Sequence, residues 1–192
     1  MRQIILIGGG GHCRSVIDVI ESQNKFKIAG IVDKSKLKNF KVLGYPIIGN
    51  DLDLKILAKK YKNAVITLGH IKSATSRQRL FNLAIQAGFR MLGIISCTAH
   101  VSKRSVIGKG TVVMHGAIIN SNSSIGENCI INSKALIEHD CTIFKHCHIS
   151  TNTTINGGTI IEKGCFVGSG STTKEYIKIR KNTFIKAATL VK

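Results

Sequence analysis

From Val101 to Val191, an Ile or Val recurs at every sixth position, with Thr173 as the one exception. The fourth residue after each of these positions is small, being Ser, Thr, Ala or Cys everywhere except at Ile177. A period of six is the signature of a parallel β-helix, in which each unit supplies one short strand and one turn. We expect the Ile and Val side chains to point inward and to stack on their equivalents three units later, while the small side chains fill the corners.

The first half of the chain has a different pattern, in which apolar runs alternate with segments of helical spacing. The apolar runs predict strands over residues 3–7, 26–32, 64–68 and 89–95, and the helical spacing predicts helices over 12–22, 52–61 and 76–87. This alternation is typical of a small parallel α/β domain. We therefore predict a Rossmann-like α/β domain over residues 1–97, followed by a parallel β-helix of about five coils over residues 98–192.

The composition narrows the possible partners. The 192 residues are 43% hydrophobic, and 28 Lys and Arg against 10 Asp and Glu give a net charge of +18. No apolar run approaches the roughly 20 residues that span a bilayer, so we expect a cytoplasmic protein with no membrane insertion. The excess of basic residues would suit binding to nucleic acid. The chain has only ten Phe and Tyr residues and no Trp, however, which leaves few aromatic rings for stacking on bases. Small phosphorylated cosubstrates are the favoured polyanions.

The six cysteines give no sign of a metal site. They have no C-x-x-C spacing, and four of them occupy small positions of the repeat: Cys129, Cys141, Cys147 and Cys165. A buried thiol behaves as a small apolar side chain, so we interpret these four as corner residues and expect no metal.

A glycine-rich turn follows the first predicted strand. The run Gly8–Gly11 and the next residue, His12, precede a predicted helix, where bare backbone N–H groups can hold phosphate. The third glycine of a dinucleotide fingerprint would fall on Cys13, so a nucleotide sugar or phosphate is favoured over NAD. Asp33 ends the second strand, where it can accept a hydrogen bond from a ribose or a base. A tight turn without ligand is the alternative.

One histidine stands between two carboxylates. His139 lies between Glu138 and Asp140, the only one of the seven histidines in such a position. A carboxylate on one ring nitrogen fixes the tautomer and leaves the other nitrogen as a base. Acyl transfer from a thioester needs such a base and a donor for the oxyanion, with no enzyme nucleophile. A solvated turn histidine is the alternative.

The GGGGH turn, followed by hexapeptide repeats that carry IEHDC over residues 137–141, resembles a known family. These features are similar to left-handed β-helix sugar acetyltransferases of the sialic-acid O-acetyltransferase and bacillosamine-type N-acetyltransferase branch. The resemblance covers essentially the whole chain. It implies acetyl transfer from acetyl-CoA to the amino group of a nucleotide-activated amino sugar in bacterial surface-glycan biosynthesis. O-acetylation of sialic acid or a related surface sugar is the alternative.

The expected site combines the residue patterns with this resemblance. The expected catalytic residues are His139 as the base and Asp140, which orients it. The expected substrate-binding residues are Gly10, Gly11, His12, Asp33 and Asn132. The expected binding residues for the cosubstrate acetyl-CoA are His148, Gly168 and Gly170. The roles of His12, Asn132 and His148 are implied by the resemblance alone.

Apolar residues at outward positions of the repeat predict an oligomer. They are Ile118, Ile130, Leu136 and Ile160. Outward apolar side chains need a covering partner, and related enzymes pack as trimers with a cleft between neighbouring prisms. We therefore expect a homotrimer with shared sites.

Overall fold

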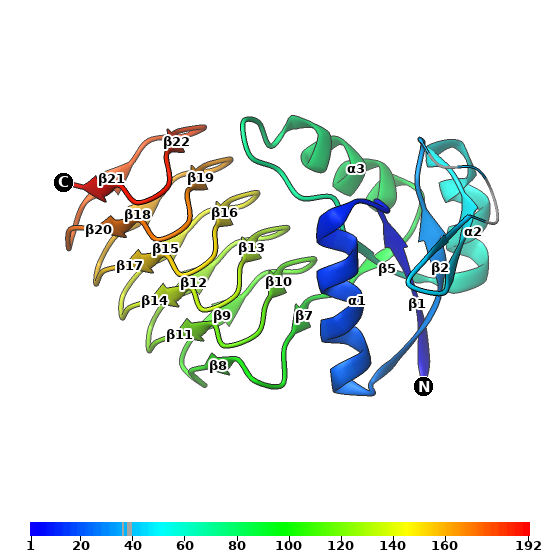
Figure 1. Cartoon of the computed structure of the whole chain (residues 1–192), viewed down its shortest axis with the longest axis horizontal. Helices are drawn as coiled ribbons and strands as arrows, with labels where there is room; N and C mark the ends of the chain where they lie inside the picture. The colour runs from blue at the N-terminus through cyan, green and yellow to red at the C-terminus, as the bar shows by residue number, and fades with distance from the viewer. Residues whose placement is uncertain (36, 38–39) are drawn as a thin grey trace.

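The computed structural model describes residues 1–35, 37 and 40–192. An α/β domain is followed by a stack of triangular coils (Figure 1). No helix in these described ranges combines the length and apolar character needed to cross a bilayer.

The α/β domain contains one six-stranded sheet. Its elements are β1 (Arg2–Ile7), α1 (Gly11–Gln23), β2 (Phe26–Val32), β3 (Lys41–Val42), β4 (Tyr45–Gly49), the 3-10 turn η1 (Asp51–Asp53), α2 (Leu54–Tyr61), β5 (Asn63–Ile66), α3 (Thr75–Gln86) and β6 (Arg90–Met91). The strand order is β3-β4-β2-β1-β5-β6, with β3 antiparallel to β4 and the other pairs parallel. The strand order reverses at β1, and ligands of such sheets bind at the carboxyl ends of the strands beside this point.

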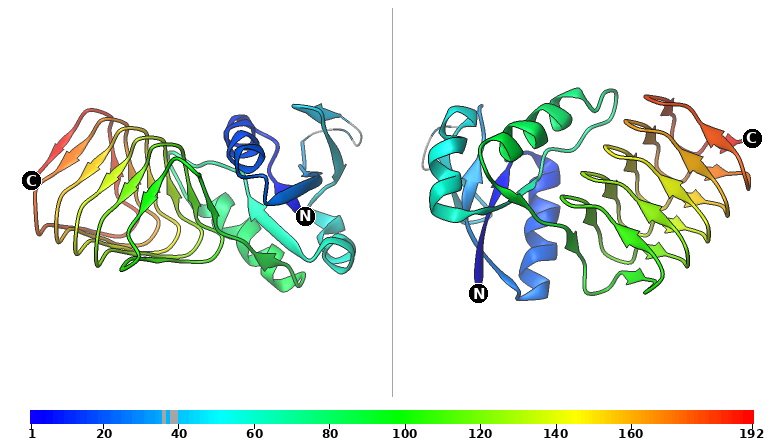
Figure 2. Two further views of the ribbon diagram at one scale, coloured as in Figure 1. Left: turned by 90° about the horizontal axis from the view of Figure 1, so that it is seen from below. Right: turned by 180° about the vertical axis from the view of Figure 1, so that it is seen from behind.

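The β-helix is built from two-residue strands. They are β7 (Ile94–Ile95), β8 (His100–Val101), β9 (Val106–Ile107), β10 (Val112–Val113), β11 (Ile118–Ile119), β12 (Ser124–Ile125), β13 (Ile130–Ile131), β14 (Leu136–Ile137), β15 (Thr142–Ile143), β16 (His148–Ile149), β17 (Thr154–Ile155), β18 (Ile160–Ile161), β19 (Phe166–Val167), β20 (Thr172–Thr173), β21 (Lys178–Ile179), β22 (Phe184–Ile185) and β23 (Leu190–Val191). They form three parallel sheets of six, six and five strands. Figure 2 shows the successive coils stacked one behind the other.

We name the three sheets by their order along the chain. Face 1 runs from β7 to β22, face 2 from β8 to β23, and face 3 from β9 to β21. Corner 1/2 is the turn from face 1 to face 2, corner 2/3 the turn from face 2 to face 3, and corner 3/1 the turn back to face 1.

The interior of the coils follows the six-residue period. Ile119 pairs with Ile137, which pairs with Ile155, and all three side chains are fully buried. Cys129, one of the corner cysteines, is also fully buried and reduced. The predicted inward stacking and the predicted fold class of an α/β domain plus a left-handed parallel β-helix are therefore confirmed.

The two parts pack together through α1 and face 1. Val16, Val19 and Ile20 of α1 belong to the same buried cluster as Ile94 and Val112 of face 1. The opposite side of the α/β sheet is covered by α2 and α3 (Figure 1). Because α1 is apolar on two sides, it joins the sheet to the β-helix.

Two expectations from the sequence differ from the structure. The strand expected over residues 89–95 is divided between β6 in the first sheet and β7, which is the first rung of face 1. Ile130 is fully buried instead of outward and unpartnered, because it lies on face 1 between Val112 and His148, under the α/β domain. The domain boundary between residues 97 and 98 stays a prediction.

Candidate active site

A first hollow of about 380 Å³ opens at the carboxyl ends of β1 and β2, and we call it the strand-end pocket. Asp33 lines it, and one carboxylate oxygen accepts a hydrogen bond of 2.6 Å from the Gly9 backbone N–H. The other oxygen accepts from the backbone N–H and the hydroxyl of Ser35, at 2.9 and 2.7 Å. The carboxylate of Asp33 therefore fixes the glycine-rich turn against the end of β2.

The glycines of this turn serve different purposes. Gly8 has a φ of 110°, and a Cβ there would lie 2.8 Å from the backbone nitrogen of Leu68, so only glycine fits. A Cβ on Gly10 or Gly11 would meet nothing within 4 Å. Gly10 is the N-cap of α1, and no capping side chain occupies the start of this helix, which borders the pocket described next. This arrangement suits an anionic group.

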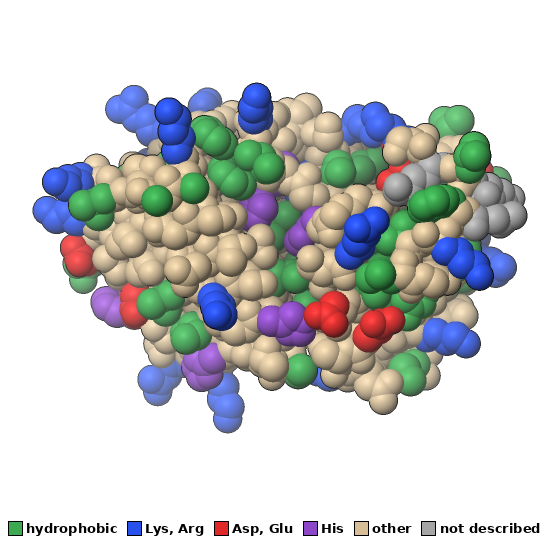
Figure 3. Space-filling model, viewed as in Figure 1, with side chains coloured by type: hydrophobic (Ala, Val, Ile, Leu, Met, Phe, Trp, Pro, Cys, Tyr) green, Lys and Arg blue, Asp and Glu red, His purple; other side chains and the backbone are tan. Residues whose placement is uncertain are grey.

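A second hollow of about 740 Å³ lies between the α/β domain and corner 1/2, and we call it the interdomain pocket. It brings together five of the predicted binding residues: Gly10, Gly11, His12, Asn132 and His148. The segment 68–70, which we call the strap, lines both pockets. Figure 3 shows histidine side chains on this border between the two domains.

The hydrogen bonds of His148 fix its tautomer. Its Nδ1 lies 2.7 Å from the backbone carbonyl oxygen of His70, which can only accept, so Nδ1 carries the proton. Its Nε2 then accepts from the Asn132 side-chain amide at 3.2 Å. Burial, with a smaller contribution from the charge of Arg77, lowers the pKa of His148 to about 4, against the opposing effect of the His70 carbonyl. His148 is therefore a neutral acceptor in the interdomain pocket.

A buried cation lies beneath this group of histidines. Arg77 of α3 is fully buried and donates hydrogen bonds to three backbone carbonyls, those of Ile66, Leu68 and Asn128, at 2.9, 2.7 and 3.1 Å. Burial lowers its pKa to about 9, so it stays charged at neutral pH. Burial and the charge of Arg77 lower the pKa of His12 to about 3.

Sequence reasoning missed two residues of this region as site residues. His70 ends the strap, and its position just after the strand predicted over residues 64–68 was the only signal for it in the sequence. Arg77 lies inside α3, where the spacing is that of an ordinary amphipathic helix. Its role in tying the strap to the coils becomes visible only when Leu68 and Asn128 are brought together.

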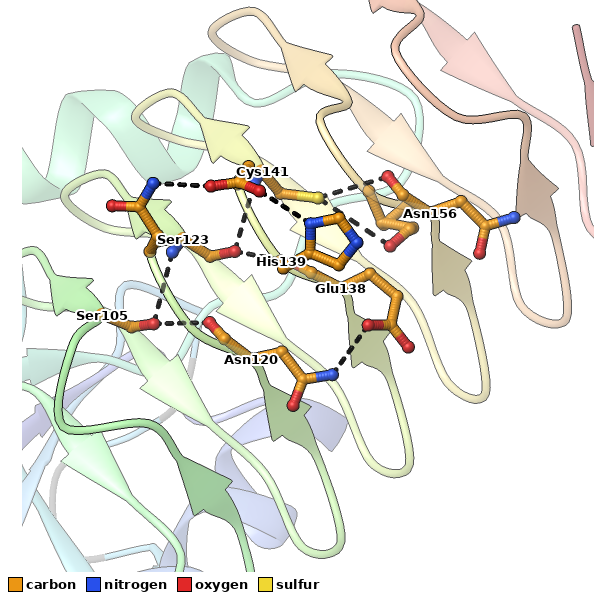
Figure 4. A network of polar contacts seen from close by, with 10 residues as sticks. Ser105, Asn120, Ser123, Glu138, His139, Cys141 and Asn156 are labelled. Atoms are coloured by element: carbon orange, nitrogen blue, oxygen red, sulfur yellow. Dashed lines mark hydrogen bonds and ion pairs between the residues drawn. The ribbon is translucent and has the colours of Figure 1, made fainter.

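The predicted catalytic pair lies at corner 2/3 (Figure 4). His139 Nδ1 is 2.7 Å from Asp140 Oδ2, and the Asn122 amide donates to Asp140 Oδ1 at 2.6 Å. These two hydrogen bonds, that of Asn122 first, hold the pKa of Asp140 below its usual range. Asp140 has a φ of 60°, and this turn conformation brings its side chain beside that of His139. An ionised Asp140 accepts a hydrogen bond from Nδ1–H and so leaves Nε2 as the basic nitrogen.

The surroundings of His139 keep its ring in place. A Cβ on Gly157, one coil further on, would lie 2.8 Å from the His139 ring, so the ring rests against bare backbone. Glu138 is directed elsewhere and accepts from the Asn120 amide at 2.9 Å. The His139 side chain is 55% exposed. Asp140 is therefore the carboxylate that contacts the ring, and Glu138 is not.

The two parts of the predicted site lie on different corners of one chain. Asn132 follows face 1 at corner 1/2, whereas His139 follows face 2 at corner 2/3. His139 lines neither of the two pockets. Gly168 lies at corner 1/2, two coils beyond Asn132, and a Cβ there would lie 2.4 Å from the Ala187 nitrogen. Gly170, at the same corner, has a φ of 68°.

No group of three or more His, Cys, Asp or Glu in the described part of the chain has the arrangement of a metal site. The buried histidines instead use backbone carbonyls, amides and one another's rings as neighbours.

Comparison with known proteins identifies both halves. Residues 3–83 match the PglD N-terminal domain, and residues 104–139 match the bacterial transferase hexapeptide (six repeats). A search of curated protein sequences finds no match.

Solved structures match the chain over its full length. One is a His-to-Asn mutant of perosamine N-acetyltransferase from Caulobacter crescentus, in complex with CoA and GDP-perosamine. It has 30% identity and a TM-score of 0.94, over 100% of this chain and 89% of that chain. Another is the acetyltransferase domain of PglB from Neisseria gonorrhoeae, at 25% identity and a TM-score of 0.92, over 100% of this chain and 92% of that chain. A structure of the same domain in complex with acetyl coenzyme A matches at 25% identity and a TM-score of 0.90, over 99% of this chain and 92% of that chain.

Proposed function

We propose that this chain, which belongs to the left-handed β-helix family of sugar acetyltransferases, transfers an acetyl group from acetyl-CoA to the amino group of a nucleotide-activated amino sugar. The observation that carries the proposal is the end-to-end match to a perosamine N-acetyltransferase with CoA and GDP-perosamine bound. The need for acetyl-CoA favours a cytoplasmic reaction.

The two pockets suit the two ends of a nucleotide sugar. In the proposal, the nucleoside occupies the strand-end pocket beside Asp33, and the sugar occupies the interdomain pocket beside His12, Asn132 and His148. The phosphates lie between them, near the open start of α1. Nucleic acid and membranes have no part in the proposal.

Corner 1/2 suits the acetyl-CoA arm. A Cβ on Gly170 would meet nothing within 4 Å, so an extended chain can lie close to the backbone there, whereas the space beside Gly168 is filled by the backbone of the next coil at Ala187. We assign these two residues, with His148, to the binding of acetyl-CoA.

The chemical step uses His139 as the base. The amine nitrogen of the sugar attacks the thioester carbonyl carbon, and His139 Nε2 takes the proton that the amine loses. Collapse of the tetrahedral intermediate breaks the C–S bond, and the thiolate of CoA leaves and takes up a proton. Asp140 holds the ring and stabilises its positive charge. Both substrates bind together, so no covalent enzyme intermediate is needed.

A homotrimer would complete the site. The outward residues of face 2 carry no charged side chain: they are His100, Ile118, Leu136, Thr154, Thr172 and Leu190. Ile118 and Leu190 are 40% and 61% exposed. If face 2 packs around a threefold axis, corner 1/2 of one copy meets corner 2/3 of the next. His139 of one copy then faces the pockets of its neighbour.

The test of the function is acetyl-CoA consumption by the whole chain. A panel of UDP- and GDP-linked amino sugars is compared with the same sugars lacking the amino group and with sialic acids. We expect turnover with at least one nucleotide amino sugar and none with its hydroxyl counterpart. Turnover with sialic acid or a hydroxyl acceptor alone would favour the O-acetyltransferase.

A further inference from the structure

The strap 68–70 forms the border between the strand-end pocket and the interdomain pocket, since all three of its residues line both. It lies close against the glycine-rich turn. A Cβ on Gly8 would lie 2.8 Å from the Leu68 nitrogen, and a Cβ on Gly69 would lie 3.4 Å from the His12 Cβ. A ligand with one end in each pocket must therefore pass over the strap.

The side chain of His70 is the unexplained group at this border. It is 7% exposed, and neither ring nitrogen makes a hydrogen bond of good geometry among the described residues, although the backbone of Cys165 lies close enough to act on its pKa. Buried polar groups are nearly always paired, so a buried imidazole without a well-formed hydrogen bond calls for a functional explanation. The backbone of His70 does have a role, because its carbonyl oxygen accepts a hydrogen bond from the Nδ1–H of His148.

The ring of His70 is neutral at physiological pH. Burial, followed by the charges of His148 and Arg77, lowers the pKa of His70 to about 3, although the carbonyl of Cys165 opposes this effect. A neutral imidazole has one N–H that donates and one nitrogen that accepts. Phosphate oxygens are acceptors, and hydrogen bonds to charged groups are the stronger ones.

We infer that His70 is a substrate-binding residue, whose ring N–H donates a hydrogen bond to a phosphate oxygen where the diphosphate of the nucleotide sugar crosses the strap. This inference rests on the proposed function and adds to it the residue that holds the joint between nucleotide and sugar. Arg77 supports this role as a positioning residue, because it donates hydrogen bonds to the carbonyl of Ile66 just before the strap and to that of Leu68 within it.

Three variants of the full chain test the inference: His70→Leu, His70→Asn and His70→Gln. Each keeps the backbone carbonyl that holds His148. We expect His70→Leu to raise the Kd of UDP or GDP in calorimetry and the KM of the nucleotide sugar about tenfold, the worth of one good hydrogen bond. The KM of acetyl-CoA and the affinity for the phosphate-free nucleoside stay within twofold. In His70→Asn and His70→Gln, the side-chain amide N–H takes the place of one ring nitrogen or the other. These variants should recover most of the lost affinity for the nucleoside diphosphate.

His146→Gln is the matched control. His146 is also a buried histidine, with a pKa lowered to about 4 mainly by burial, but it packs on Phe81 outside both pockets. Its variant keeps the wild-type KM values. The inference would be overturned if His70→Leu bound the nucleoside diphosphate with wild-type affinity, or if it raised the KM of acetyl-CoA instead. In either case the wild-type chain would still transfer the acetyl group to a nucleotide sugar. Failure of the proposed function differs, because the wild-type chain itself would then acetylate no nucleotide sugar.

Discussion

At the scale of the residue, the arrangement around His139 separates its two acidic neighbours. Asp140 contacts the ring at 2.7 Å, whereas Glu138 is bound to Asn120. A base acts mainly in the transition state, so its loss should change turnover and leave binding unchanged.

We predict that His139→Ala lowers kcat by about 10²–10⁴, the usual worth of a positioned base, and leaves the KM of both substrates nearly unchanged. Asp140→Asn should lower kcat by a smaller factor, because the ring stays in place beside a poorer hydrogen-bond acceptor. Glu138→Gln is the control and should change kcat only slightly. Steady-state kinetics with acetyl-CoA measures all three. Near-normal turnover in His139→Ala, with His148→Ala inactive, would assign the base to His148 instead.

Asp33 gives a second prediction at this scale. Its carboxylate accepts a hydrogen bond from the Gly9 N–H and lines the strand-end pocket, so Asp33→Ala loosens the turn and removes the contact proposed for the nucleoside. We expect the Kd of the nucleotide sugar to rise about tenfold, with little change for acetyl-CoA. Calorimetry with each ligand checks this. Equal weakening of both ligands would point to a general loss of folding.

At the scale of the element, each coil supports the functional groups of the coil before it. Gly157 lies directly beside the His139 ring, so the sequence of one coil determines the position of the base on the previous one. The same eighteen-residue spacing brings the Asn122 amide to Asp140. The predicted catalytic pair is therefore held by its two neighbouring coils.

Gly157→Ala tests this support. The new Cβ would lie 2.8 Å from the His139 ring and must displace it. Because misplacement of a catalytic group by about 1 Å can cost on the order of 10² in rate, we expect kcat to fall by about that factor while the melting temperature changes little. Gly93→Ala, whose Cβ would make an ordinary contact of 3.5 Å with the Thr111 carbonyl oxygen, is the control. Unchanged kcat in Gly157→Ala would show that the ring position is not critical.

At the scale of the whole molecule, a group of neutral histidines links the two domains and makes stability depend on pH. The pKa values of His12 and His70 are lowered to about 3, and those of His146 and His148 to about 4, mainly by burial. The unfolded chain binds these protons near pH 6.5, and the folded chain does so only at lower pH. The unfolded state therefore holds more protons between about pH 4 and pH 6.5, and stability rises with pH across this window.

We predict that the free energy of unfolding falls by several kcal/mol between pH 7 and pH 4.5 and changes little between pH 7 and pH 8. Urea unfolding at a series of pH values measures it. His146→Gln should flatten the dependence because it removes one of the four groups. An equal slope in the wild type and in His146→Gln would contradict the assignment.

The shared site of a trimer gives the last prediction. His139→Ala lacks the base, and His148→Ala lacks a group of the interdomain pocket. Trimers mixed from these two inactive variants should regain activity, because one copy supplies the intact pocket and its neighbour the intact base. Each variant alone is the control, and sedimentation should give the mass of three chains. Mixed assemblies without activity would place the whole site within one copy.

The sequence by itself determined the architecture, because both of its patterns are local. The six-residue period is repeated in every rung, so each Ile or Val meets the same interior environment and the same fold follows from Val101 to Val191. It also determined the pairing of His139 with Asp140, since adjacent residues at a turn need no distant partner. The β-helix begins one unit earlier than the pattern suggested, at Ile94–Ile95.

Only the tertiary structure decided what the two halves form together. Packing of α1 on face 1 buries Val112, and the folded domains place the strap beside Asn132 and His148, residues that lie more than 60 positions away in the chain. Arg77 has no local signal, because its three acceptors come together only after folding. The sequence predicted candidate residues, whereas packing decided that Gly10, Gly11, His12, Asn132 and His148 line one pocket and that the predicted base lies away from it.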